Sequence, residues 1–126
     1  MTQRLYVIQD DLFFAERVRT TAARLGLEPV MLSPAAAGTR TWEAADVVVI
    51  QVTLNPDRQL SLIENLRRSA PALQVVAVTG HLETDLRTRA KALGAVLAAH
   101  SSMERVLARA CQRKDGRDHA APPPPD

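Results

Sequence analysis

This 126-residue sequence has few aromatic residues, a single cysteine and almost no net charge. Aromatic side chains make up 3% of the residues, so a core must be built from the aliphatic part of the 46% hydrophobic content. The lone Cys111 excludes an internal disulfide and a metal cage of several cysteines. It falls on the apolar side of a helical pattern, which indicates a packed thiol.

Long apolar runs are also missing. None approaches the roughly 18 residues that cross a membrane, and the N-terminal segment lacks the charged-then-apolar layout of a signal peptide. The net charge of +2 comes from 16 basic and 14 acidic residues that are interleaved along the chain, whereas a nucleic-acid footprint needs a basic cluster. We therefore expect a cytoplasmic protein that binds neither membranes nor nucleic acid.

Short apolar runs alternate with longer helical patterns along the chain. The helical patterns repeat apolar residues at three- and four-residue spacing, and Gly26 and Gly94 end two of them. Pro29 lacks a backbone donor, so the run that it opens is expected at a sheet edge. The apolar runs expected to form strands are LYVI (5–8), PVML (29–32), VVVIQV (47–52), VVAV (75–78) and AVLAA (95–99).

The alternation predicts one α/β domain over residues 1–112. Strands that are apolar throughout favour a parallel sheet covered on both faces, and right-handed crossovers make it doubly wound. Before the last helix, Ser101 and Glu104 have the spacing of a capping box. From Arg113 onward the chain holds no apolar residue larger than alanine and ends in a proline run, so residues 113–126 are expected to form a disordered tail.

Polar residues follow the predicted strands where each one ends. In a doubly wound sheet, ligands collect beyond the carboxyl ends of the strands. These ends carry Gln9 and Asp10, Gln51, Thr79, and either His100 or Ser101.

In the order and spacing of these segments the chain resembles the receiver domain of bacterial two-component response regulators. The intervals from Asp10 to Gly26, from Asp46 to Gln51 and from Thr79 to Ala95 match receivers without gaps, and the resemblance covers residues 4 to about 112. It implies a flavodoxin-like fold, a five-stranded parallel sheet of order 2-1-3-4-5 with helices on both faces.

The resemblance also implies a phosphorylation site, from which this sequence departs. A receiver has two acids after its first strand, a phosphoacceptor aspartate after the third, a hydroxyl residue after the fourth and a lysine after the fifth. Here Gln9 replaces the first acid, Asp10 keeps the second, Gln51 stands at the acceptor position and Thr79 keeps the hydroxyl. The lysine position holds Ser101 or, with a one-residue gap, His100.

These departures remove the chemistry of phosphotransfer. An amide is a poor nucleophile, so Gln51 cannot form an acyl phosphate. Mg²⁺ needs carboxylates, and one acid with two amides makes a weak site, so no metal or cofactor is expected. No lysine supplies a fixed cation for a phosphoryl group. We expect Gln51 instead to donate a hydrogen bond to Asp10 and to accept one from Thr79, in a neutral network.

Simpler explanations stay open for the same residues. Gln51 fits a satisfied polar group at a strand end, and Ser101 fits a helix cap. Asp10 or Asp11 fits a cap of the first helix. His81 and His100 have no cysteine or histidine partners at metal-binding spacing, so both are expected to be free of metal.

The leading hypothesis is a single-domain pseudo-receiver without enzymatic activity that acts as a protein-interaction or signalling adaptor. Its partner is a protein or a second copy of the chain. The alternative is a regulatory module that binds a nucleotide or small molecule in the crevice at the strand ends. Against this alternative, the loop after the first strand lacks phosphate-wrapping glycines and carries two acids. A third hypothesis is a partner or DNA-linked subunit that docks through the charged tail or Pro122–Pro125, although a tail of this composition is more often a solubilising end.

Receivers commonly dock partners through the fourth helix, fifth strand and fifth helix. Phe13 is a further candidate, either as an exposed partner anchor or as a seal over the crevice. The candidate partner-binding residues are Phe13, His81, Asp85, Arg89, Met103, Arg105 and Arg109.

Overall fold

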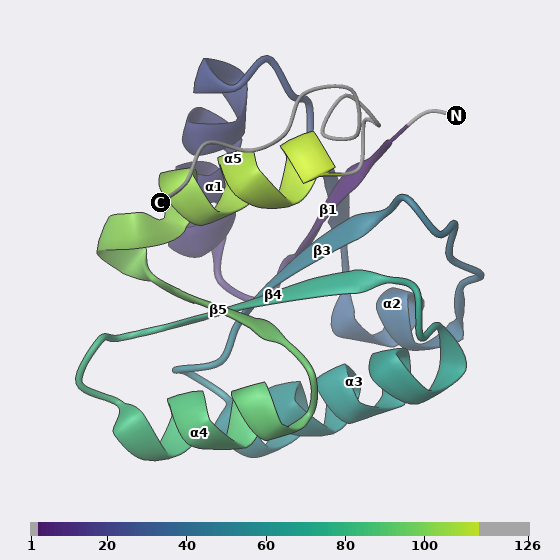
Figure 1. Ribbon diagram of the computed structural model, residues 1–126, viewed down its shortest axis with the longest axis vertical. Coiled ribbons are helices and arrows are strands. Elements are labelled where there is room, and N and C mark those ends of the chain that lie inside the picture. Colours follow the sequence, from purple (N-terminus) through teal and green to yellow (C-terminus); the bar gives the residue numbers. More distant parts are fainter. Residues whose placement is uncertain (1–2, 114–126) are drawn as a thin grey trace.

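The computed structural model describes residues 3–113, so residues 114–126 of the predicted tail lie outside the described residues, while Arg113, its first residue, ends helix α5. Strands and helices alternate along the chain (Figure 1). The elements are β1 (Leu5–Ile8), α1 (Leu12–Arg24), β2 (Val30–Leu32), α2 (Pro34–Thr39), β3 (Val47–Gln51), α3 (Pro56–Ser69), β4 (Gln74–Thr79), α4 (Thr84–Ala92), β5 (Val96–Ala99), the 3₁₀ turn η1 (His100–Ser102) and α5 (Met103–Arg113).

The strands form one parallel sheet of order β2-β1-β3-β4-β5, which confirms the predicted doubly wound fold. Strand β2 lies at the edge, as Pro29 predicts, because a residue without an N–H cannot pair on both sides. The central strands β1 and β3 are buried along their full length, which explains why they are apolar on both faces.

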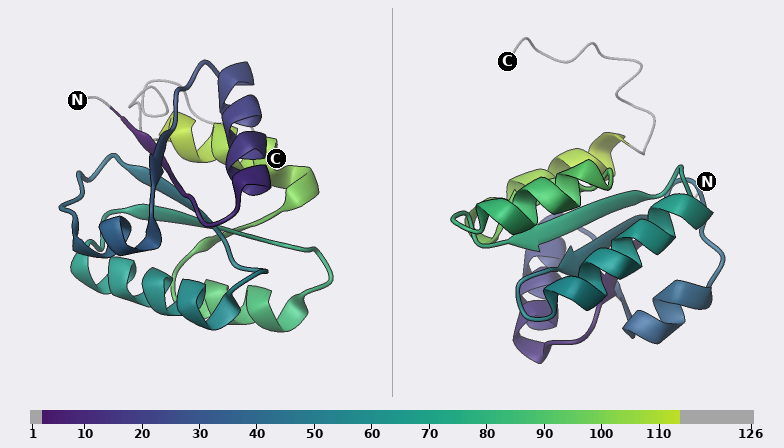
Figure 2. Two further views of the ribbon diagram at one scale, coloured as in Figure 1. Left: turned by 180° about the vertical axis from the view of Figure 1, so that it is seen from behind. Right: turned by 90° about the horizontal axis from the view of Figure 1, so that it is seen from below.

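Helices cover both faces of the sheet. Helices α1 and α5 lie on one face and α2, α3 and α4 on the other (Figures 1 and 2). Alternate strand residues feed two cores. Val49 packs with Phe14 and Val18 under α1 and α5, whereas Ile50 packs with Leu60 on the α3 side.

Local signals set most helix ends. Asp11 caps α1, because its carboxylate accepts a hydrogen bond from the Phe13 N–H at 3.2 Å. Ser33 caps α2 through the Ala36 N–H at 3.1 Å, and Pro34 and Pro56 each stand in the first turn of a helix.

The predicted capping box from Ser101 to Glu104 is wrong. The chain enters α5 through η1, where the Ser102 hydroxyl accepts a hydrogen bond from the Ala99 N–H at 3.0 Å. Glu104 pairs with Arg24 of α1 at 2.8 Å, so a tertiary partner takes the carboxylate that the box would have used.

Within the described residues, no helix is both long and apolar enough to cross a membrane.

Candidate functional site

The predicted site residues lie at one edge of the sheet, because parallel strands all end on the same side. Asp10 follows β1, Gln51 ends β3, Thr79 ends β4 and His100 follows β5. The pairing continues just past β3, where the Val52 N–H donates to the Val78 carbonyl at 2.9 Å. The strand ends therefore lie together at this edge, but their side chains divide into separate groups.

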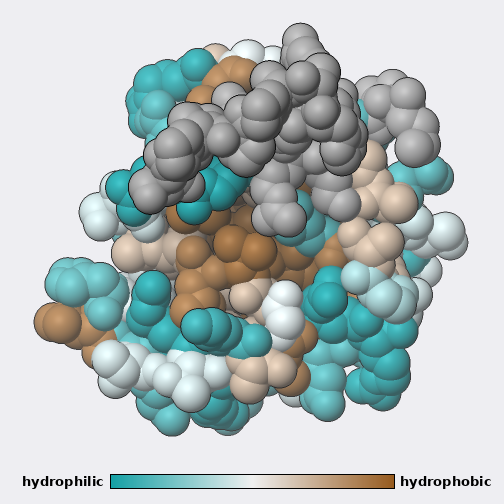
Figure 3. Space-filling view, viewed as in Figure 1, coloured by the Kyte–Doolittle hydropathy of each residue, from teal (hydrophilic) through white to brown (hydrophobic). Residues whose placement is uncertain are grey.

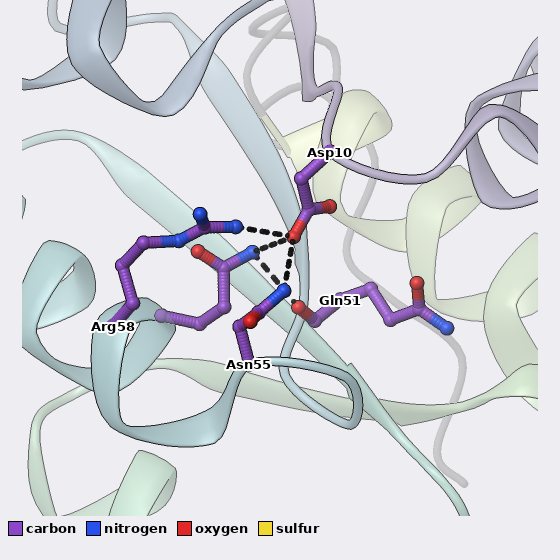
Figure 4. Close-up of polar contacts among 5 residues, drawn as sticks. Asp10, Gln51, Asn55 and Arg58 are labelled. Atoms are coloured by element: carbon purple, nitrogen blue, oxygen red, sulfur yellow. Dashed lines mark hydrogen bonds and ion pairs between the residues drawn. The ribbon is translucent and has the colours of Figure 1, made fainter.

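The first group surrounds the Asp10 carboxylate, which is only 7% exposed. Its Oδ2 atom accepts from the Arg58 guanidinium at 2.8 Å, the Gln59 amide at 3.2 Å and the Asn55 amide at 3.4 Å (Figure 4). A cation and two amides thus hold the only predicted acid of the crevice.

The start of α3 explains this arrangement. Asn55 is the N-cap residue, and Pro56 begins the helix with a fixed φ. Arg58 and Gln59 then fall in the first turn, beside the β1 exit. The positive end of the helix dipole also favours a carboxylate there. Arg58 and Gln59 were not among the predicted site residues, although their place directly after an Asn-Pro helix start was a usable signal.

The predicted hydrogen bonds of Gln51 are not formed. Its side chain points away from Asp10 (Figure 4), and its buried Oε1 has no hydrogen-bond partner among the described residues. Its backbone carbonyl accepts from the Gln59 amide at 3.0 Å. Gln59, which is fully buried, therefore bridges β3 and Asp10 as Gln51 was expected to do.

Strand alternation explains the error. Gln51 shares its face with Val47 and Val49, under α1 and α5, whereas Asp10 meets the first turn of α3. The next residue, Val52, is fully buried in the core on the α3 side. Neither Gln51 nor Val52 offers a carboxylate at the β3 exit.

Thr79 belongs to a second group. Its buried hydroxyl accepts from the Arg87 guanidinium of α4 at 3.0 Å, so it is not bonded to Gln51. The expectation that the crevice lacks a fixed cation is therefore wrong. Arg58 and Arg87 both reach the strand ends from helices, where the sequence pattern did not place them.

Glu83 ties two loops of the crevice together. Its Oε1 accepts from the Thr53 hydroxyl at 2.7 Å and from the Gly80 N–H at 2.6 Å. The Thr53 hydrogen bond first, and the Gly80 bond second, lower the pKa of Glu83, with a smaller contribution from His100. The loops after β3 and β4 are thereby joined by a charged hydrogen-bond acceptor.

His100 forms a third group with α1. Its ring stands edge-to-face to Phe14, with centroids 6.2 Å apart. Burial and the nearby Arg17 lower the pKa of His100, and Glu83 opposes them. Ser101 is exposed beside it, and Gln9 is exposed at the end of β1. Neither approaches Asp10 within hydrogen-bonding distance.

The described residues do not fit a divalent cation. Between residues 3 and 113 no group of three His, Cys, Asp or Glu side chains is placed to hold a metal ion. The Asp10 carboxylate is already neutralised by the Arg58 guanidinium. A metal would have to displace this cation with amides as its other ligands, which Mg²⁺ disfavours.

The prediction of Met103 as a docking residue is wrong. It is 2% exposed in the core under α5, so it cannot contact a partner. Phe13 is 84% exposed, which agrees with an anchor rather than a seal. The remaining candidates are exposed, namely His81, Asp85, Arg89, Arg105 and Arg109.

No family model and no curated protein matches the sequence. Solved structures do match. A response regulator from Thermotoga maritima is 18% identical, with 89% of this chain and 99% of that chain covered and a TM-score of 0.71. A CheY-like protein (tadZ) from Pseudomonas aeruginosa is 22% identical, with 90% and 99% covered and a TM-score of 0.72.

The chain has the receiver fold. A third match, the receiver domain of NtrX from Brucella abortus, is 20% identical, covers 86% of this chain and 98% of that domain, and has a TM-score of 0.69. The receiver fold of this chain thus spans nearly all described residues, while Asp10 meets a guanidinium in its crevice.

Proposed function

We propose that this receiver-fold chain is a protein-interaction module of signalling that does not accept a phosphoryl group. The observation that carries the proposal is the 2.8 Å contact between Arg58 and the Asp10 carboxylate. A receiver would hold a metal ion at this place. Here the guanidinium of the chain itself occupies it.

The second part of this argument is the missing nucleophile. The β3 exit offers the Gln51 amide and the Val52 side chain, and neither can form an acyl phosphate. Thr79 keeps its hydroxyl, but Arg87 holds it from α4. The metal position, the phosphoacceptor position and the surroundings of the Thr79 hydroxyl are thus all altered. We infer that the fold signals through contacts made by its surfaces.

Two apolar surfaces support docking of a protein. The large hydrophobic side chains that the structure exposes lie at the strand-exit end, in the first turn of α1 and in the loops after β3 and β4, namely Leu12 at 72%, Phe13 at 84%, Leu54 at 58% and Leu82 at 81%. Exposed apolar clusters are typical of interaction sites. A second band of hydrophobic residues crosses the sheet between α4 and α5 (Figure 3), where Val96 and Leu97 of β5 are half-buried.

The comparisons add a related case. A structure described as a putative pilus assembly protein (cpaE) from Burkholderia thailandensis is 18% identical, covers 89% of this chain and has a TM-score of 0.70. The fold therefore occurs in proteins whose described role is other than response regulator, which is compatible with an adaptor role here. The alternative of a nucleotide or small molecule in the crevice is not favoured, since Asp10 and the first turn of α3 fill it.

Phosphorylation chemistry gives the first test. The protein is incubated with acetyl phosphate and Mg²⁺ beside a conventional receiver that has all its acids, and intact masses are measured. We expect a phosphoryl adduct on the conventional receiver alone. A labile phosphate on this chain would overturn the proposal.

Docking gives the second test. A pull-down from the native cytosol is repeated with Phe13→Ser/Leu82→Ser at the strand-exit end and with Arg105→Glu/Arg109→Glu on α5. We expect one pair of substitutions to abolish capture of a specific partner while both variants remain folded. Capture that neither pair changes would remove the strand-exit end and the exposed side of α5 as docking sites.

A further inference from the structure

A groove outside the crevice runs between the outer side of α1 and the start of α5. It encloses about 320 Å³, within the range of small-molecule sites. Arg17, Thr20 and Arg24 line it from α1. His100, Ser101 and Glu104 line it from the β5 exit and the start of α5. Two residues of the predicted phosphorylation site thus have a different neighbourhood from the one expected, because His100 and Ser101 face α1.

Most charges of the groove are paired. Arg24 binds Glu104 at 2.8 Å and closes one end, and Glu16 lies 3.6 Å from Arg19 on the next turn of α1. Arg17 is the exception, because within residues 3–113 it has neither a hydrogen bond nor an ion pair. The groove therefore carries one uncompensated guanidinium.

Neutral donors stand beside this cation. The exposed hydroxyls of Thr20 and Ser101 make no side-chain hydrogen bond to any described residue. The Nδ1 atom of His100 is buried without a partner, and Phe14 fixes the ring from the other side. Guanidinium and hydroxyl groups together are the donors that bind carboxylate and phosphate oxygens.

We propose that this groove binds a small oxyanion, with Arg17 as its cation and Ser101 and Thr20 as hydroxyl donors. The shared chemistry is that of a monocarboxylic acid or a phosphate monoester. The proposed ligands do not include Asp10 or the exposed apolar residues of the docking surfaces, so the binding test is independent of the interaction role.

Occupancy changes the state of His100. In the free protein, burial and Arg17 lower the pKa of His100, Glu83 raises it, and the paired Glu16, Arg24 and Glu104 line the same groove. A bound anion neutralises the repulsion from Arg17 and favours the imidazolium, so it raises the pKa of His100. Binding is then linked to proton uptake, and affinity increases as the pH falls through the pKa of His100.

The test is NMR titration of the His100 ring in the full-length protein, with exposed His81 as the internal reference. Lactate is the carboxylate probe, because its charge stays constant between pH 5.5 and 8, and glycerol 3-phosphate is the phosphate-ester probe. Sodium chloride at equal ionic strength is the control. We expect a saturable shift of His100 with at least one probe, a rise of its pKa on binding and tighter binding of lactate at the lower pH.

Matched variants identify the cation. Arg17→Gln should weaken binding about tenfold or more, because a charged hydrogen bond is lost. Arg109→Gln removes the same charge from an exposed position of α5 outside the groove and should leave binding unchanged. Shifts that chloride reproduces, that His81 shares or that Arg17→Gln retains would overturn the proposal. So would the absence of saturation with both probes.

Discussion

The Arg58 guanidinium lies 2.8 Å from the Asp10 carboxylate, joining the start of α3 to the exit of β1. Asp10 is 7% exposed and Arg58 is 51% exposed, so the acid is buried while the base retains contact with water. The pair closes the crevice with charges from the chain alone. The stability of the crevice is therefore expected to depend on Arg58.

Arg58→Gln should lower the free energy of unfolding by about 1–2 kcal/mol, because a buried carboxylate loses its cation while solvent screens part of the effect. Urea unfolding followed by circular dichroism measures it. Arg68→Gln removes an exposed charge from the far end of the same helix and should have little effect. Adding Asp10→Asn to Arg58→Gln should restore part of the loss, and equal losses in the Arg58 and Arg68 variants would contradict the role of the pair.

The two buried glutamines should respond in opposite directions to the same substitution. Gln59→Met removes hydrogen bonds to Asp10 and to the Gln51 carbonyl and should cost about 1–3 kcal/mol. Gln51→Met replaces a buried, unpartnered amide oxygen among apolar neighbours and should stabilise the fold by about 1 kcal/mol. Chemical denaturation of both variants checks the signs. A loss of stability in Gln51→Met would show that its amide has a structural role.

Alanine substitutions at three glycines distinguish the cost of backbone strain from the cost of a steric clash. Gly94 has φ of +95°, and a Cβ there would lie 2.8 Å from Arg67 Nε. Arg67 is itself held by the Pro71 and Leu73 carbonyls, so it cannot move freely. Gly26 has φ of +74° but nothing within 4 Å, and Gly38 lies in α2 without a positive φ.

We expect Gly94→Ala to be the most destabilising of the three, Gly26→Ala to cost about 1 kcal/mol, and Gly38→Ala to stabilise by about 0.5–1 kcal/mol. Thermal unfolding ranks them. A Gly94 variant no worse than the Gly26 variant would mean that Arg67 gives way without cost.

Stability should fall on mild acidification because of His100. Burial, followed by Arg17, lowers the pKa of His100 in the folded protein below its ordinary value of 6.5. The unfolded chain then binds more protons below pH 6.5, so stability declines from there down to the folded pKa. Glu83 acts in a separate pH window below 4.5. Because its pKa is lowered in the folded protein, its contribution to stability is lost only as the pH falls below that value. His100→Gln should flatten the stability profile just below pH 6.5, and an unchanged profile would exclude His100 as its source.

Cys111 should be protected from thiol reagents. Burial raises the pKa of its thiol to about 11, so little thiolate forms at pH 8. Reaction with a chromogenic disulfide should be about 100-fold slower than in denaturant. A native rate close to the denatured rate would mean that the end of α5 opens readily.

The expected fold is confirmed because its signals were local and redundant. Apolar runs on both faces of β1 and β3, Pro29 at the edge and the glycines after α1 and α4 all favour one topology. The errors arose where a side chain had a choice of partner. The Gln51 side chain points away from Asp10, and the Glu104 carboxylate pairs with Arg24 instead of capping α5.

The sequence by itself determined the order of elements, the parallel sheet and the absence of an acid at the end of β3. Each of these follows from the type of residue at a position and from its spacing along the chain. Only the tertiary structure decided that Arg58 and Gln59 hold Asp10, that Arg87 holds Thr79 and that His100 faces Arg17. Long arginine and glutamine side chains reach whichever neighbour the packed helices bring near, and a linear pattern carries no record of that distance.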